Sequence, residues 1–194
     1  MESPIAIGFD LSLTRTGVAV VGPEGIECAS FGRKGKRDES LEMRYNRIFD
    51  LADEAVRFIY EHMEHPLIAV IEDNPFGSVG GSSHDRSGLW WQIYHRLHRE
   101  GIPVVQINVS KVKIYACGRA NKLEKDDILL ATVRRHPLAP ISNNDEADAV
   151  NLALMGARLI GQPIEESLPQ THLRAMDGIE RPTMAVLSQS ETAS

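Results

Sequence analysis

The most constraining feature of this sequence is an acidic residue inside its first apolar segment. Asp10 follows Ile5-Ala6-Ile7-Gly8-Phe9, and a turn from Thr14 to Gly17 leads into a second apolar segment. A lone carboxylate is costly to bury and is normally compensated by a partner or a metal ion. Asp10 could instead cap a turn. A metal site would require other acidic residues that the fold brings next to Asp10.

The length and composition of the chain fit one cytoplasmic domain. Its 194 residues contain enough apolar side chains for a proper core. The two cysteines, Cys28 and Cys117, form neither a disulfide framework nor a CxxC pattern, which favours a reducing compartment. No segment has the pattern of a signal peptide or the length of a membrane-spanning apolar run. We therefore expect a soluble cytoplasmic protein with no membrane partner.

The hydrophobic periodicity predicts an α/β fold with three consecutive antiparallel strands followed by strands alternating with helices. The predicted strands are residues 4–12, 16–22, 25–32, 67–72 and 102–107, and the predicted helices are residues 39–62, 85–99, 123–136 and 144–160. After Gly161 the periodicity stops, and Pro, Ser, Thr and Gln become more frequent. We expect residues 1–161 to form the domain and residues 162–194 to be a poorly ordered tail.

Three further acidic residues could converge on Asp10. Glu72 ends the fourth predicted strand, which could lie beside the first strand, and Asp145 and Asp148 lie one turn apart on the last helix. Glu72 could also be a solvated acid at a strand end, and Ser142 with Asp145 fits a capping box. A capping box accounts less well for Asp148, because Asp148 lies one turn further along the helix. Four acids at one edge of a sheet would repel one another, and a pair of divalent metal ions would remove that conflict.

Basic residues are clustered although the net charge is −6. The residues after Gly161 contribute −3 of this charge. The first basic cluster is Arg33, Lys34, Lys36 and Arg37, and the second is Lys111, Lys113, Arg119, Lys122 and Lys125. Either cluster alone would be an ordinary solvated loop. Two clusters in a chain that also gathers carboxylates indicate phosphate contacts beside a metal site.

Four motifs in order resemble the RuvC-type Holliday junction resolvases of the RNase H-like superfamily, particularly their phage versions. These motifs are Ile7-Gly8-Phe9-Asp10-Leu11-Ser12 with Thr16-Gly17, then Ala69-Val70-Ile71-Glu72, then Tyr115-Ala116-Cys117-Gly118-Arg119-Ala120-Asn121-Lys122, and last Asp145-Glu146-Ala147-Asp148-Ala149. The resemblance covers residues 4–160. Actin-like ATPases and sugar kinases share a similar first motif, but they need a duplicated domain that 194 residues do not provide.

The resemblance implies an RNase H-like fold with a central five-stranded mixed sheet flanked by helices. It also implies an endonuclease that resolves four-way DNA junctions by paired nicking in a bacterial or phage-infected cell. Asp10, Glu72, Asp145 and Asp148 would bind two Mg²⁺ ions, for which Mn²⁺ would substitute. Two such ions activate a water and stabilise the leaving 3′ oxygen during phosphodiester hydrolysis.

The resemblance also implies roles for several lysines and aromatic residues. The family uses a lysine near its metal site, and either Lys122 or Lys125 could supply it. A second family lysine corresponds to Lys113 or Lys111, although each of these could be a plain surface residue. Phe76 is the candidate for stacking on bases at the junction centre.

The helix that carries Trp90, Trp91 and Tyr94 corresponds to the dimer helix of the family. We expect one tryptophan in the core and the other exposed or against a partner. Three other functions remain open. The same site could cut flaps and forks, it could cut RNA–DNA hybrids, or the chain could be a DNA-binding scaffold without catalysis.

Overall fold

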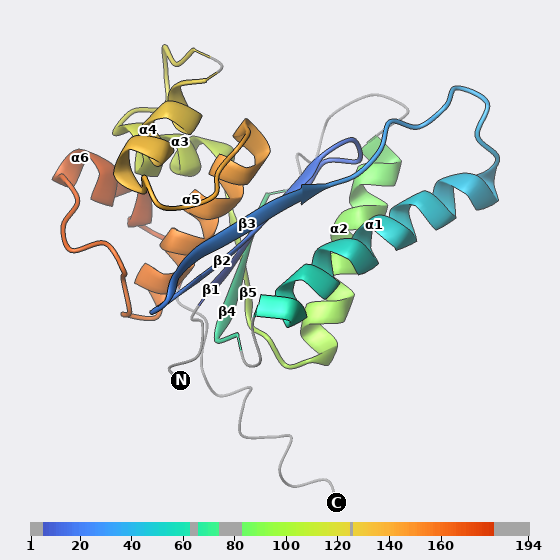
Figure 1. Ribbon diagram of the computed structural model, residues 1–194, viewed down its shortest axis with the longest axis horizontal. Coiled ribbons are helices and arrows are strands. Elements are labelled where there is room, and N and C mark those ends of the chain that lie inside the picture. The colour runs from blue at the N-terminus through green and yellow to red at the C-terminus, as the bar shows by residue number, and fades with distance from the viewer. Residues whose placement is uncertain (1–5, 63–65, 74–82, 125, 181–194) are drawn as a thin grey trace, which may run out of the picture.

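A five-stranded mixed sheet forms the centre of the computed structural model, which describes residues 6–62, 66–73, 83–124 and 126–180. The strands lie in the order β3-β2-β1-β4-β5 (Figure 1). β1, β2 and β3 are antiparallel neighbours, whereas β4 and β5 run parallel to β1. Their bounds are Ala6–Asp10, Thr16–Gly22, Gly25–Phe31, Ile68–Glu72 and Val104–Ile107. The predicted mixed sheet is therefore confirmed.

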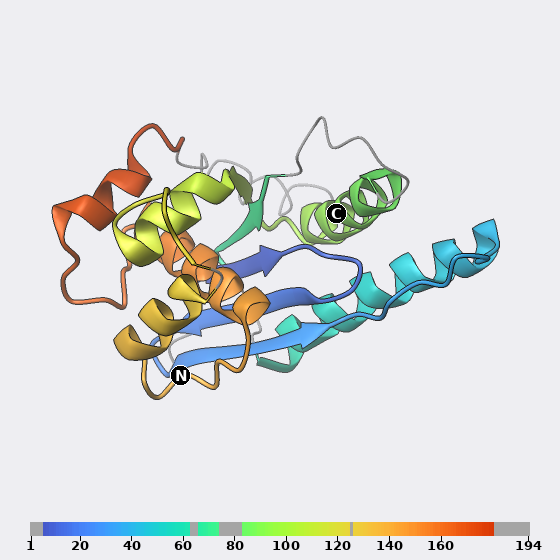
Figure 2. The same ribbon diagram turned by 90° about the horizontal axis from the view of Figure 1, so that it is seen from above.

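Helices cover both faces of the sheet. α1 (Leu41–His62) and α2 (Ser83–Arg99) pack together on one face. α5 (Asn144–Leu159) lies across the other face, with α3 (Val109–Cys117), α4 (Asp127–Arg135), α6 (Gln170–Leu173) and the 3-10 turn Arg174–Met176 around it (Figures 1 and 2). Among the described residues, none of the helices has the length and apolar character needed to cross a bilayer.

The alternation of side chains along the strands assigns Asp10 and Glu72 to the same face. Ile7 and Phe9 of β1 belong to the core under α1 and α2. Ala6 of β1 and Val70 of β4 belong to the core under α5. Because side chains alternate between the two faces of a strand, Asp10 and Glu72 point toward α5.

Two glycines allow α5 to lie directly against the sheet. A Cβ on Gly8 would lie 2.0 Å from the carbonyl oxygen of Ala149, and a Cβ on Gly17 would lie 2.0 Å from that of Asp145. Any side chain at these positions would collide with the helix backbone. Gly17 is also the residue that pairs with Asp10 across β1 and β2. This contact therefore brings the first turn of α5 to the level of Asp10.

The turn between β1 and β2 is closed by Thr16. Its Oγ1 donates to the carbonyl oxygen of Ser12 at 2.7 Å and accepts from the Ser12 backbone N–H at 3.2 Å. The Thr16 side chain is fully buried. The turn is thus held by a local side-chain bond, which fixes where the chain leaves Asp10 and enters β2.

α3 was not predicted from the sequence. This helix has only nine residues, and its identity depends on its ends. The Asn108 side chain accepts from the Ser110 backbone N–H at 2.8 Å, and Gly118 ends the helix with a φ of 72°. These are standard capping features, but the segment is too short for a clear period. α4 correspondingly begins at Asp127 and not at residue 123.

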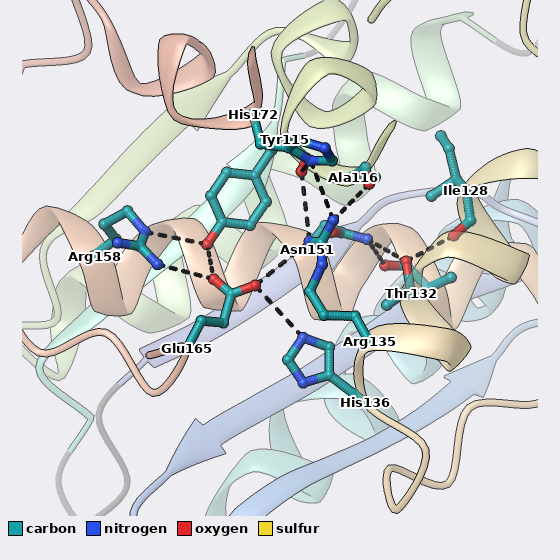
Figure 3. Close-up of polar contacts among 11 residues, drawn as sticks. Tyr115, Ala116, Ile128, Thr132, Arg135, His136, Asn151, Arg158, Glu165 and His172 are labelled. Carbon is teal, nitrogen blue, oxygen red and sulfur yellow. Dashed lines mark hydrogen bonds and ion pairs between the residues drawn. The ribbon is translucent and has the colours of Figure 1, made fainter. Parts of the chain in front are cut away.

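The expectation of a poorly ordered segment from residue 162 is wrong for residues 162–180, which pack against α3, α4 and α5. Figure 3 shows Glu165 between Arg135, Arg158 and Tyr115. The Glu165 carboxylate lies 3.1 Å from Arg158 Nη2, 3.4 Å from Arg135 Nη1 and 3.6 Å from His136 Nε2. Buried charges need such partners, which a composition-based reading cannot detect. Residues 181–194 lie outside the described part of the chain.

We expect Glu165→Ala to lower the free energy of unfolding by about 3 kcal/mol, because it leaves two mostly buried arginines without their shared carboxylate. Burial raises the Glu165 pKa, but the nearby His136 and the hydrogen bonds from Tyr115 and Arg158 outweigh it, so the pKa is lowered. The stabilisation is therefore present above the unfolded pKa near 4.5 and is lost as pH falls through the lower folded value. Urea unfolding of Glu165→Ala and of the exposed neighbour Glu166→Ala, at pH 7 and at pH 3, measures this. Equal stability of the two variants at pH 7 would contradict the prediction.

We expect Gly17→Ala to destabilise the protein by about 2 kcal/mol or to shift the start of α5, because its methyl group would overlap the Asp145 carbonyl. Gly88→Ala is the matched control, since among the described residues a Cβ there meets only Ile48 Cδ1, at 3.7 Å. Thermal unfolding of both variants compares them directly. A Gly17→Ala protein as stable as Gly88→Ala would show that α5 does not depend on this contact.

Candidate functional site

Two acidic residues end neighbouring strands at the centre of the sheet. Phe9 of β1 pairs with Ile71 of β4 in parallel register, so the next residues, Asp10 and Glu72, are neighbours on the α5 face. This confirms the expectation that the first and fourth strands lie side by side. Each strand is fully buried up to its last residue, which is partly exposed. The two carboxylates therefore lie side by side where the buried core meets the surface.

The start of α5 contributes the other two acids. Asn143 caps the helix by accepting from the Glu146 backbone N–H at 3.1 Å. The Glu146 carboxylate in turn accepts from Ser30 Oγ and from the backbone and hydroxyl of Ser142 at 2.8–2.9 Å. The predicted cap of Ser142 with Asp145 is thus wrong by one residue. Glu146 is thus held by the cap, whereas the charges of Asp145 and Asp148 act on Asp10.

The four acids act on one another electrostatically. Burial raises the pKa of Asp10 to about 8, with further contributions from the charges of Glu72, Asp148 and Asp145. Burial likewise raises the pKa of Asp148 to about 7, with contributions from Glu72 and Asp145. Burial also raises the pKa of Glu72. The site therefore concentrates more negative charge than its protein surroundings neutralise.

The residues at this site fit a hard divalent cation. All four side chains offer carboxylate oxygens, which Mg²⁺ and Mn²⁺ prefer. Asp148 Oδ1 is buried without a hydrogen-bond partner among the described residues. Within the same part of the chain, no group of three or more His, Cys, Asp or Glu side chains is close enough to enclose one ion. An open arrangement of few carboxylates is compatible with Mg²⁺, which keeps several of its waters.

Of the lysines expected near the acids, Lys113 lies close enough to act on them. Its charge lowers the pKa of both Glu72 and Asp148. Lys111 is engaged elsewhere, since its Nζ donates to the carbonyl oxygens of Ala175 at 3.1 Å and Asp177 at 2.5 Å. Lys111 thus fastens residues 175–177 onto α3. Of these two lysines, only Lys113 therefore acts on the acids.

The remaining basic candidates lie around the third motif. Lys122 is exposed and has a left-handed φ of 56°. Arg119 Nη2 lies 3.9 Å from Oδ2 of Asp127, the first residue of α4. Lys125 and the aromatic candidate Phe76 lie outside the described residues.

The first basic cluster follows β3 and extends toward α1. Arg33 donates to Asp50 of α1 at 2.9 Å, whereas Lys34, Lys36 and Arg37 are exposed. Gly35 lies against the Arg47 and Glu39 side chains, so close that a Cβ there would be 2.8 Å from Glu39 Oε2. The glycine inside the cluster therefore lets the basic segment lie on α1.

The two tryptophans of α2 differ in burial, as expected: one lies in the core and the other is exposed. Trp90 is 7% exposed and lies in the core under α1 and α2, whereas Trp91 is 58% exposed. Tyr94 stacks on Trp90 with a centroid distance of 5.3 Å and on His98 at 5.8 Å. Trp91, Tyr94 and His98 thus form an aromatic stripe along one side of α2.

Two cations near the acids were missed from the sequence. Arg86, in the first turn of α2, lowers the pKa of both Asp10 and Glu72. Arg15, in the turn after β1, lies 3.6 Å from Asp145 Oδ2. Neither belongs to a basic cluster, and only the folded arrangement of α2 and of the turn brings them to the site.

Comparison with known proteins finds similarity at the level of structure. No family model and no curated protein matches the chain. The structure of RuvC from Thermus thermophilus is similar, with a TM-score of 0.58, 16% sequence identity, and coverage of 81% of this chain and 96% of that chain. RuvC from Thermus thermophilus in complex with a Holliday junction substrate gives a TM-score of 0.61 and 14% identity over the same shares. The chain therefore has the RNase H-like α/β fold of RuvC.

Proposed function

We propose that this protein is a metal-dependent endonuclease that resolves four-way DNA junctions by paired nicking. The observation that carries the proposal is the convergence of Asp10, Glu72 and Asp148 at one edge of the sheet, each with a raised pKa. A catalytically idle scaffold would have no need for such mutually repelling acids. A RuvC of the same fold has been solved in complex with a Holliday junction substrate, which favours branched DNA as the partner.

In this proposal the chain's own side chains have separate roles. Asp10, Glu72, Asp145 and Asp148 hold two Mg²⁺ ions. When bound, those ions supply an activated water and stabilise the leaving 3′ oxygen. Lys113 faces the same acids and attracts a phosphate oxygen toward them. Lys34, Lys36, Arg37 and Arg119 are exposed cations that contact other backbone phosphates of the DNA.

The substrate proposal also requires two copies of the chain. A junction is nearly two-fold symmetric, and a two-fold dimer would place one site on each of two opposing strands. Trp91, with Tyr94 and His98 beside it, provides an exposed aromatic stripe on α2 suited to such an interface. We therefore propose that the dimer forms through α2.

We expect Asp10→Asn and Glu72→Gln each to lower junction cleavage by at least about 100-fold, since even outer residues of metal sites contribute 10–100-fold. Junction binding should persist. Asp73→Asn is the matched control, because Asp73 is adjacent to Glu72 but contacts Gln106.

Strand-resolved cleavage of four-way junctions, forks, flaps and RNA–DNA hybrids measures both activity and substrate preference. Paired symmetric nicks only in the junction support a resolvase, cleavage of the other substrates indicates a different nuclease, and binding without cleavage indicates a scaffold.

We expect Mn²⁺ to raise the melting temperature of the wild-type protein more at pH 8 than at pH 6, because the ion competes with protons for Asp10 and Asp148. Their folded pKa values, about 8 and about 7, exceed the unfolded value of 3.8. Without metal, these groups stabilise the fold below pH 3.8, and that contribution is lost as pH rises toward 8. Asp10→Asn should therefore be more stable than wild type at pH 8 without metal and should gain less from Mn²⁺. A Mn²⁺ effect that is the same in both proteins would contradict this assignment.

A further inference from the structure

A hollow of about 420 Å³ lies beside the acidic site. It is bounded by the turn after β1, by the first basic cluster and by the first turns of α1 and α2. Its charged lining residues are Lys36, Arg37, Glu39, Arg44, Arg47, Asp85 and Arg86. Because Ser12 and Arg86 both border it, the hollow adjoins the edge where Asp10 and Glu72 lie.

Two arginines of α1 build the floor of this hollow. Arg44 forms a bidentate pair with Asp85 of α2, at 2.5 and 3.1 Å. Arg47 pairs with Glu39 at 3.0 Å, and both side chains are at most 10% exposed. These pairs fix the segment around Glu39 and the first turn of α2 against α1. The geometry of the hollow is thus set by two ion pairs, of which the Arg47–Glu39 pair is buried.

The lining carries a net positive charge after these pairs are formed. It contains five cations and two acids, so its net charge is +3. Because Arg44 and Arg47 offset Asp85 and Glu39, the surplus belongs to Lys36, Arg37 and Arg86. Ser12 and Thr14 add hydroxyl groups on the side nearest β1, 3.1 Å from each other.

Arg86 connects this hollow to the acids electrostatically. It lines the hollow, and its charge lowers the pKa of Asp10 and Glu72. Its Nε is buried, with no hydrogen-bond partner among the described residues. A buried donor without a partner destabilises a fold and is usually matched by a ligand or a water. The guanidinium group is also the side chain that best forms two parallel hydrogen bonds to a phosphate.

We infer that this hollow binds the DNA backbone phosphate next to the cleaved one, with Arg86 as the contact residue and Lys36 and Arg37 at its rim. The inference rests on the proposed function, because it names a subsite of the same nuclease site. Arg44 and Arg47 are positioning residues, which act by holding Asp85 and Glu39. A backbone phosphate held here places the neighbouring phosphodiester at the four carboxylates.

The simpler role for Arg86 is that of a counter-ion to the acids. The two roles differ in what the loss of Arg86 changes. A counter-ion would alter the pH and Mn²⁺ dependence of protein stability and leave the salt slope of DNA binding unaffected, because it contacts no phosphate. A phosphate contact would alter DNA affinity and its dependence on salt, because each phosphate contact displaces bound counterions.

The test measures junction binding in the Asp10→Asn background, without divalent metal, over a series of NaCl concentrations. Adding Arg86→Gln should weaken binding by about tenfold and lower the slope of log K against log salt by about 1. Arg86→Lys should retain the slope and recover only part of the affinity, because it keeps the charge but not the bidentate geometry. Arg99→Gln, at the exposed opposite end of α2, is the matched control and should leave both quantities unchanged.

The possible outcomes separate this inference from the proposed function. If the wild-type protein cuts junctions but Arg86→Gln leaves affinity and slope unchanged, the subsite is wrong and the nuclease assignment stands. If the wild-type protein neither binds nor cuts any branched DNA, the proposed function itself fails. A thermal-shift series with inorganic phosphate distinguishes the source of the phosphate. Strong Arg86-dependent stabilisation by free phosphate, together with unchanged DNA affinity, would assign a small-anion site and overturn the inference.

Discussion

The close contact between α5 and two glycines of the sheet is the constraint on which the candidate site depends. Gly8 and Gly17 offer no side chain where the carbonyl oxygens of Ala149 and Asp145 approach. Since Gly17 pairs with Asp10 in the sheet, α5 begins beside the end of β1 that carries Asp10. The same contact that packs the core therefore sets the spacing of acids that come from distant parts of the sequence. Precise positioning follows from backbone contact, which is stiffer than contact through side chains.

The described acidic residues whose pKa is shifted fall into two groups. Glu165, Asp85, Glu39 and Glu146 each have hydrogen-bonding partners and a lowered pKa. Asp10, Glu72 and Asp148 have a raised pKa, with burial as its main cause. The first group contributes to the structure as ionised carboxylates. The second group costs stability when ionised, which is typical of a functional site.

The sequence was sufficient to predict those parts of the fold that depend on periodicity. The five strands, α1, α2 and α5 follow from apolar patterns, and the alternation along β1 and β4 predicts that Asp10 and Glu72 share a face. The sequence could not predict α3, whose caps define a helix of only nine residues. Nor could it predict which residue caps α5, or that Arg86 lies beside Asp10, because both depend on contacts between segments distant in the chain.

The order of residues 162–180 has a consequence for the smallest unit of this chain that can fold. Tyr115, Arg135 and Arg158 meet at a carboxylate that lies beyond the last long helix, and Lys111 is held by carbonyl groups still further along. A chain ending at Gly161 would expose the apolar surface that Ala175 covers. It would also leave these polar groups without their partners next to that apolar surface. The folding unit therefore extends about one short helix past the point where the hydrophobic pattern ends.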